Sequence, residues 1–118
     1  MFQKKEENNE LTELITGISI RTLVYGEKTL TAEFQLKKGS TLPVHKHPHE
    51  QTGYLISGKM EFMIDGKIHV AEPGDSWCME GNIPHGAEVI EDSVVLEVFT
   101  PVRADYLPET LSRRRQAR

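Results

Sequence analysis

Apolar and polar residues alternate along much of the chain. In residues 30–36 the apolar side chains fall at every second position, and Met60, Phe62 and Ile64 repeat this spacing. This period predicts half-buried β-strands. Shorter apolar or β-branched runs predict further strands at residues 17–24, 54–57, 67–70, 76–79, 87–90 and 93–100.

Turn residues separate these segments. Asp65-Gly66 predicts a hairpin with a type I′ turn, and Pro73-Gly74-Asp75 a second tight turn. Gly58-Lys59 should end the strand before it, and Glu91-Asp92 should join two strands as a hairpin. No convincing amphipathic helix precedes residue 103, and an irregular or short helical tail follows Pro101. The pattern predicts an all-β sandwich or barrel.

A chain of 118 residues is long enough for one domain. We expect a polar, mobile segment at residues 1–13, a β-barrel at residues 14–108 and a basic tail at residues 109–118. The tail holds four arginines, and without them the formal net charge of −4 becomes about −8. We expect a frayed, solvated tail and no nucleic-acid partner, because the body has no basic stripe.

The cysteine count and the absence of long apolar runs indicate the cellular compartment. Cys78 is the only cysteine, so no internal disulfide can form. No apolar run approaches the length of a membrane span, and no apolar segment follows the N-terminal lysines. We therefore expect a cytoplasmic protein with no membrane partner.

Three of the five histidines lie between Gly39 and Gly58. On an extended strand, His45 and His47 point to one face. Gln51 follows, and His85 comes from another hairpin that a closed sheet could bring near. We interpret these four residues as ligands of one metal ion, with open coordination positions that favour catalysis or ligand binding.

Other interpretations of the histidines stay open. Imidazole and amide ligands accept several divalent metals, so Ni, Zn, Fe and Mn all remain candidates. The histidines could instead be ordinary surface residues. We expect His69 to be exposed, and His49 to be a non-ligand at the rim of the site.

Two motifs resemble those of the cupin superfamily. Gly39-x5-His45-x-His47-x3-Gln51-x6-Gly58 is similar to the first, and Gly66-x6-Pro73-Gly74-Asp75 followed by Ile83-Pro84-His85 is similar to the second. The resemblance implies a jelly-roll β-barrel with the metal inside it, held by the four residues named above. Many cupins have Glu at the position of Gln51. A neutral ligand leaves the site more positive, which favours an anionic substrate.

Residues 96–107, with His-Pro-His-Glu-Gln at 47–51, resemble the small pectin-degradation cupins. Those proteins ketonise 4,5-unsaturated uronates. The resemblance implies that Phe99 and Arg103 bind substrate and that Glu97 stands where the family has a catalytic Asp. It also implies a homodimer.

The last predicted strand places Val95, Glu97 and Phe99 on one face. If that face is the barrel interior, burial raises the pKa of Glu97 toward the range useful for proton transfer. Arg103 could then hold a substrate carboxylate. The alternatives are a partly solvated or ion-paired Glu97 and a surface Arg103.

The leading interpretation is a metal-dependent sugar-acid isomerase or tautomerase acting on a small anionic substrate. A metal-dependent dioxygenase and a non-catalytic small-molecule-binding module remain as alternatives, because fold alone does not decide function.

Overall fold

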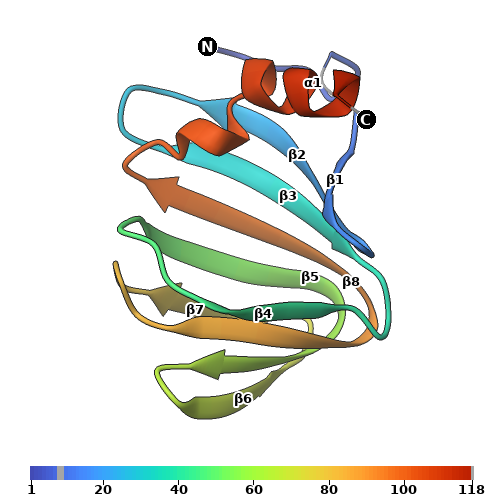
Figure 1. The fold of residues 1–118 in the computed structure, drawn as a ribbon, viewed down its shortest axis with the longest axis vertical. Helices are drawn as coiled ribbons and strands as arrows, with labels where there is room; N and C mark the ends of the chain where they lie inside the picture. The colour runs from blue at the N-terminus through green and yellow to red at the C-terminus, as the bar shows by residue number, and fades with distance from the viewer. Residues whose placement is uncertain (8–9, 118) are drawn as a thin grey trace.

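The structure is a computed structural model that describes residues 1–7 and 10–117. Within these residues the chain forms an all-β fold of antiparallel strands with one short α-helix (Figure 1). In chain order the elements are β1 (Thr12–Ile15), β2 (Ile18–Tyr25), β3 (Leu30–Leu36), β4 (Thr41–His45), β5 (Glu50–Ile64), β6 (Lys67–Ala71), β7 (Ser76–Met79), β8 (His85–Thr100), the 3₁₀ turn η1 (Ala104–Tyr106) and α1 (Pro108–Gln116).

Two long strands, β5 and β8, each take part in two layers. In one layer, the second half of β8 pairs with the first half of β5. On its other side this half of β8 pairs with β3, and this half of β5 pairs with β7. β2 and β1 extend the layer beyond β3. The first half of β8 and the second half of β5 form the other layer with β4 and β6. Inward side chains of both layers bound the interior, as in a jelly roll.

The bend between the layers explains two incorrect predictions. Residues 54–57 and 60–64 belong to one strand, and no hairpin forms at Glu91-Asp92. Gly58 has φ +97°, and a Cβ there would lie 2.4 Å from the carbonyl oxygen of Asp92. The Lys59 amide donates to Ser93 Oγ at 3.1 Å across the bend. Both turn-like sequences therefore bend strands instead of ending them.

Other local predictions are confirmed. β3 covers the alternating segment 30–36, and three of its four inward apolar residues are buried. Asp65 and Gly66 both have positive φ, +49° and +79°, between the paired residues Ile64 and Lys67. Positive φ at both central residues defines the type I′ turn that the Asp-Gly pair predicted.

The two ends of the described chain meet on one edge of the barrel (Figure 1). β1 begins at Thr12, which is buried, inside the segment expected to be mobile. The expectation of a frayed, solvated tail is wrong for Arg113, Arg114 and Arg115, which lie on α1, whereas Arg118 lies outside the described residues. Arg115 donates to Thr12 Oγ1 and Arg114 to the Leu14 carbonyl oxygen, both at 2.5 Å. Buried Leu111 anchors the helix.

The buried apolar residues fall into two clusters. One lies between the layers around Leu55, Met60 and Val95, and the other lies beneath α1 around Leu30, Phe99 and Leu111. Phe34 packs against both clusters. No helix among residues 1–7 and 10–117 has the length and apolarity needed to cross a membrane.

Candidate functional site

Three histidines converge inside the barrel. The ligating nitrogens of His45, His47 and His85 lie within 4.8 Å of one another. His45 ends β4 and is the direct cross-strand partner of His85, the first residue of β8. His47 lies in the loop just after β4, so it reaches the site without the continuous strand that its spacing suggested.

Each imidazole is oriented by a backbone carbonyl. The Nδ1 atoms of His45 and His85 lie 2.8 Å from the carbonyl oxygens of Pro43 and Ile83, and His47 Nδ1 lies 3.1 Å from that of His49. A carbonyl oxygen only accepts, so Nδ1 carries the proton in all three rings. Nε2 is then left as a lone-pair donor, the arrangement usual for metal-binding histidines.

Gln51 completes the donor set. It is buried at the start of β5, and its Nε2 donates to Glu97 Oε2 at 3.2 Å. Gln51 Oε1 and His47 Nε2 are both buried and have no hydrogen-bond partner among the described residues. Buried polar atoms without partners are rare. Two such atoms beside two more imidazoles fit a divalent transition metal.

Burial favours the neutral form of His47 and His85. Burial is the main cause that lowers the pKa of His47 to about 4; Arg103 and His85 lower it further, and Gln51 opposes the shift. Burial also lowers the pKa of His85. Neutral imidazoles are the form that binds metal, so His47 and His85 need no deprotonation at neutral pH.

Glu97 faces the same interior. Its side chain is buried, with 7 % of the residue exposed, so of the two interpretations of the alternation along β8 the inward-facing one is correct. Burial raises the pKa of Glu97 to about 8, against the opposing effects of Gln51, the Trp77 indole and Arg103. A carboxyl group with a pKa near neutrality is suited to exchange protons.

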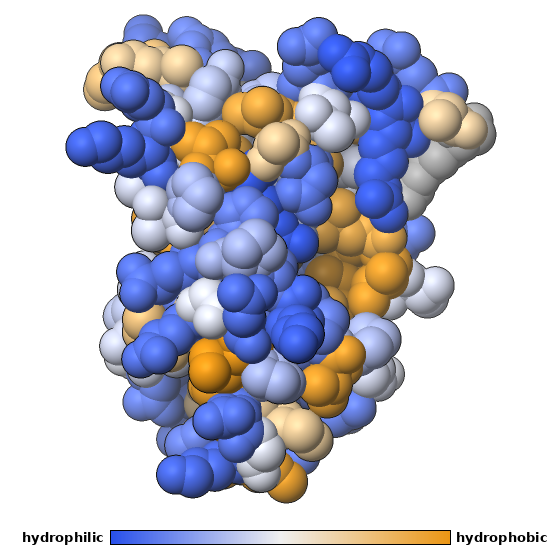
Figure 2. Space-filling view, turned by 60° about the vertical axis from the view of Figure 1, so that its left-hand side comes forward, coloured by the Kyte–Doolittle hydropathy of each residue, from blue (hydrophilic) through white to orange (hydrophobic). Residues whose placement is uncertain are grey.

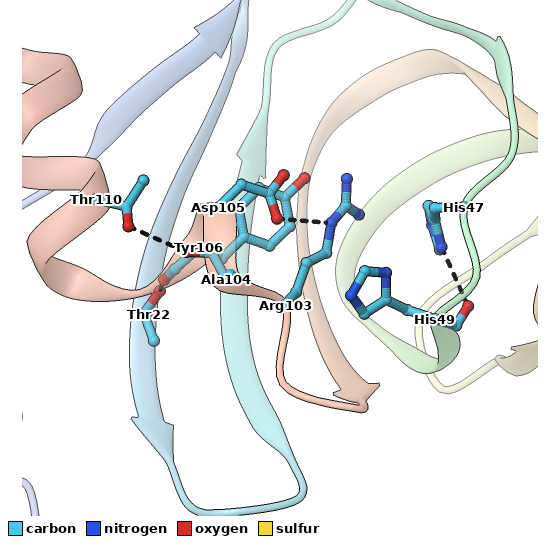
Figure 3. A network of polar contacts seen from close by, with 8 residues as sticks. All are labelled: Thr22, His47, His49, Arg103, Ala104, Asp105, Tyr106 and Thr110. Carbon is cyan, nitrogen blue, oxygen red and sulfur yellow. Dashed lines mark hydrogen bonds and ion pairs between the residues drawn. The ribbon is translucent and has the colours of Figure 1, made fainter.

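Arg103 lies in the loop after β8, beside the histidines (Figure 3). Its guanidinium carbon lies 4.3 Å from the centre of the Tyr106 ring and 5.2 Å from that of Phe99. Its Nε donates to Asp105 Oδ1 at 3.2 Å. The side chain is 15 % exposed, so Arg103 is a fixed cation at the cavity wall and not a free surface arginine.

These groups line one cavity of about 380 Å³. Five predicted site residues line it, namely His45, Gln51, His85, Glu97 and Arg103, and Asp105, Tyr106 and Arg114 add further polar groups. Most of the remaining wall is apolar and includes Phe34, Met60, Val95 and Phe99. Figure 2 shows hydrophobic atoms at the bottom of a hollow between hydrophilic atoms on one face of the molecule. The volume suits a small molecule.

The structure separates the remaining histidines from this cluster. His69 is exposed on β6, as expected. His49 is outside the three-histidine cluster but touches it, because its carbonyl oxygen accepts from His47. Phe99 is almost fully buried, with its ring centre 6.3 Å from that of His47.

Sequence reasoning missed three residues near the site. Asp105 and Tyr106 hold Arg103, and Trp77 lies beside Glu97. The aromatic and acidic residues after Arg103 gave a usable signal, since they follow it directly in the chain. The sequence carries no such signal for Trp77, because it lies near Glu97 only through the pairing of β7 and β8 with β5.

Comparison with known proteins agrees with this geometry. Residues 32–100 match the cupin domain family. The chain is 31% identical over 97 residues to the pectin degradation protein KdgF of Dickeya dadantii, covering 80% of this chain and 88% of that protein. The structure of KdgF from a Halomonas species superposes with a TM-score of 0.84 at 27% identity, covering 91% of this chain and 98% of that one. An RmlC-like cupin from Shewanella frigidimarina gives 0.84 at 26% identity, covering 90% and 95%. The chain therefore belongs to the cupin domain family.

Proposed function

We propose that this cupin ketonises 4,5-unsaturated uronates. The observation that carries the proposal is the shared cavity, in which Glu97 and Arg103 line the same wall as His45 and His85. A proton-exchanging group and a carboxylate-binding group thus face one metal-binding cluster. The similarity to the pectin degradation protein of Dickeya dadantii supports the choice of substrate class.

Arg103 supplies the anchor for the substrate carboxylate. Its guanidinium is stacked on Tyr106 and Phe99 and is held through Nε by Asp105. The contact with Asp105 leaves the terminal guanidinium nitrogens for a bidentate pair with a carboxylate. A guanidinium fixed on three sides loses little side-chain entropy when substrate binds.

Glu97 supplies the proton exchange. After the uronate ring opens, the enol must lose a proton from oxygen and gain one on carbon. A single carboxyl group does both when it gives its proton to the carbon and takes one from the enol oxygen, and it ends the cycle unchanged. The hydrogen bond from Gln51 holds the Glu97 carboxyl during this exchange.

A divalent metal held by His45, His47, Gln51 and His85 would supply Lewis-acid polarisation of a substrate oxygen.

The test of the proposed activity is to incubate metal-loaded protein with lyase-generated unsaturated monouronate and to follow the absorbance. Loss of the absorbance of the unsaturated bond supports the proposal. No loss, with oxygen uptake on a phenolic or diketone substrate, identifies a dioxygenase. Saturable uronate binding without turnover identifies a binding module.

Substitution of Glu97 should lower the turnover rate, whereas substitution of Arg103 should weaken substrate binding. Glu97→Gln keeps shape but removes the exchangeable proton, so kcat should fall about a hundredfold with little change in binding. Arg103→Ala removes a charge-assisted contact and should weaken binding by about 1.5–3 kcal/mol. Glu97→Asp restores the carboxylate of the pectin-degradation cupins and should keep activity. Native rates and affinities in both Glu97→Gln and Arg103→Ala, at unchanged metal content, would refute these roles.

A further inference from the structure

Three residues form a row across the inner face of one layer. Trp77 on β7 is the direct cross-strand partner of Gly53 on β5, and Gly53 is the direct partner of Glu97 on β8. Directly opposed residues of antiparallel strands place their side chains on the same face. Trp77 and Glu97 therefore stand on the inner face with one strand between them.

The residue between them has no side chain. A Cβ atom on Gly53 would lie 2.2 Å from Nε1 and 2.3 Å from Cε2 of Trp77. The indole thus lies directly over the β5 backbone and occupies the space that any other residue at position 53 would fill. Gly53 has an ordinary φ, so the close approach of the indole, and not the backbone conformation, is what requires glycine here.

The indole Nε1 lies over Gly53, the residue that separates Trp77 from Glu97. Trp77 Nε1 is buried and completes no hydrogen bond among the described residues, yet it is close enough to favour the ionised form of Glu97. On its other side the indole packs against the Phe62 ring, with 4.4 Å between ring centres. The indole is therefore held between the Phe62 ring and the backbone of Gly53.

We propose that Trp77 is a positioning residue that donates its indole N–H to the Glu97 carboxylate and, together with Gln51, holds that carboxylate toward the cavity. Gln51 Nε2 already donates to Glu97 Oε2. One donor fixes the distance of a carboxylate and leaves its plane free to rotate, whereas a second donor fixes the plane as well. The contact itself is independent of the reaction, but the catalytic consequence rests on the proposed function.

The contact can be tested without turnover. Trp77 is the only tryptophan, so the zinc-treated, diamagnetic protein gives one indole signal in a ¹H–¹⁵N spectrum. Glu97→Leu removes the acceptor at similar volume, and the indole proton should then move upfield and exchange faster with solvent. Tyr54→Phe is the matched control, because Tyr54 follows Gly53 on β5 but is exposed on the other face. An indole signal that responds no more to Glu97→Leu than to Tyr54→Phe would overturn the proposal.

The catalytic consequence needs a second measurement. Trp77→Phe keeps the ring and removes the N–H, so kcat on unsaturated uronate should fall about tenfold or more at unchanged KM, metal content and melting temperature. Gly53→Ala should displace the indole and lower kcat similarly. Native kcat in Trp77→Phe, or a loss that tracks metal loss or unfolding, would overturn the positioning role. If the native protein does not act on uronates, the spectrum still decides whether the contact exists.

Discussion

At the scale of single residues, one backbone hydrogen bond to each imidazole decides which ring nitrogen can bind a metal. The Nδ1 atoms of the three histidines donate hydrogen bonds to the carbonyl oxygens of Pro43, Ile83 and His49. Only the Nε2 atoms therefore keep a lone pair that can bind a metal. The backbone therefore fixes the orientation of each ring before any ion binds, so less side-chain entropy is lost when an ion binds.

Metal content tests this arrangement. Replacing His45 and His47 together by Ala removes half of the four ligands, and the purified protein should lose nearly all bound divalent metal. Elemental analysis measures the outcome. His69→Ala is the control, because this exposed histidine lies outside the cluster and its loss should leave the metal content unchanged. Full metal occupancy in the double variant would rule out this site.

The buried carboxyl of Glu97 predicts how stability depends on pH in metal-free protein. Its pKa is about 8 in the folded state and 4.5 in the reference state. Between these values the folded state keeps a proton that the unfolded state has released, so stability falls as pH rises. His47 and His85 have lowered pKa values in the folded state, so near their ordinary pKa of 6.5 the unfolded state binds protons that the folded state does not, which opposes this fall. The opposing contribution shrinks as pH rises above 7.

Urea denaturation of chelator-treated protein from pH 7 to 8 measures the effect, because most of the unfolded-state histidines are neutral in this range. The free energy of unfolding should fall by up to about 1.4 kcal/mol per pH unit. Glu97→Gln carries no titrating group and should remove most of that fall. A native slope that Glu97→Gln leaves unchanged would contradict the assignment of the buried proton to Glu97.

At the scale of elements, the bend shared by β5 and β8 decides how the layers meet. Gly58 permits it, because its left-handed backbone and its approach to Asp92 exclude a side chain. The bend also places Gln51, near the start of β5, and His85, at the start of β8, at the same cavity. A break at either strand would have separated them.

Two glycines of matched conformation test the cost of filling this bend. Gly58 and Gly74 have φ of +97° and +98°, but a Cβ at Gly74 meets nothing within 4 Å. Gly74→Ala should therefore cost only the left-handed strain, about 1–2 kcal/mol. Gly58→Ala adds a clash with the backbone and should cost clearly more by urea denaturation. Equal losses in the two variants would show that the bend tolerates a side chain.

Sequence predicted the fold class and most local elements because their signals are local. The alternation in β3 and the Asp65-Gly66 turn depend only on neighbouring residues. The bend at Gly58 and the row formed by Trp77, Gly53 and Glu97 depend on pairing between distant strands. Turn residues at a bend look the same in sequence as turn residues at a strand end, so the two continuous strands could not be read from them.

At the scale of the whole molecule, α1 packs against β1 and η1, beside the loop that holds Arg103. Leu111 packs into the cluster with Tyr106 and Phe99, which are the two rings that hold the guanidinium. Thr22 also donates a short hydrogen bond to the Tyr106 carbonyl oxygen. The candidate site was predicted from motifs at residues 45–51, 85 and 97–103, whereas this supporting cluster comes from packing that the motifs do not encode.

Removing the apolar anchor of α1 should weaken the whole barrel. Leu111 is 2 % exposed, and Leu111→Ala should lower the free energy of unfolding by about 2–5 kcal/mol through lost burial and a new cavity. Arg113→Ala, on the exposed side of the same helix, should change it little, because its ion pair with Glu109 is solvent-exposed. Thermal denaturation compares the two, and similar losses would mean that the helix does not contribute through its buried side.

The assembly of the metal site from distant segments has a consequence for folding kinetics. The histidines come from residues 45, 47 and 85, so the complete cluster exists only after β4 has paired with β8. The unfolded chain presents only the neighbouring histidines. An ion that binds the completed cluster lowers the free energy of the native state and not that of a transition state in which this pairing is still open. If the pairing of β4 with β8 completes after that transition state, a bound ion should slow unfolding without accelerating folding.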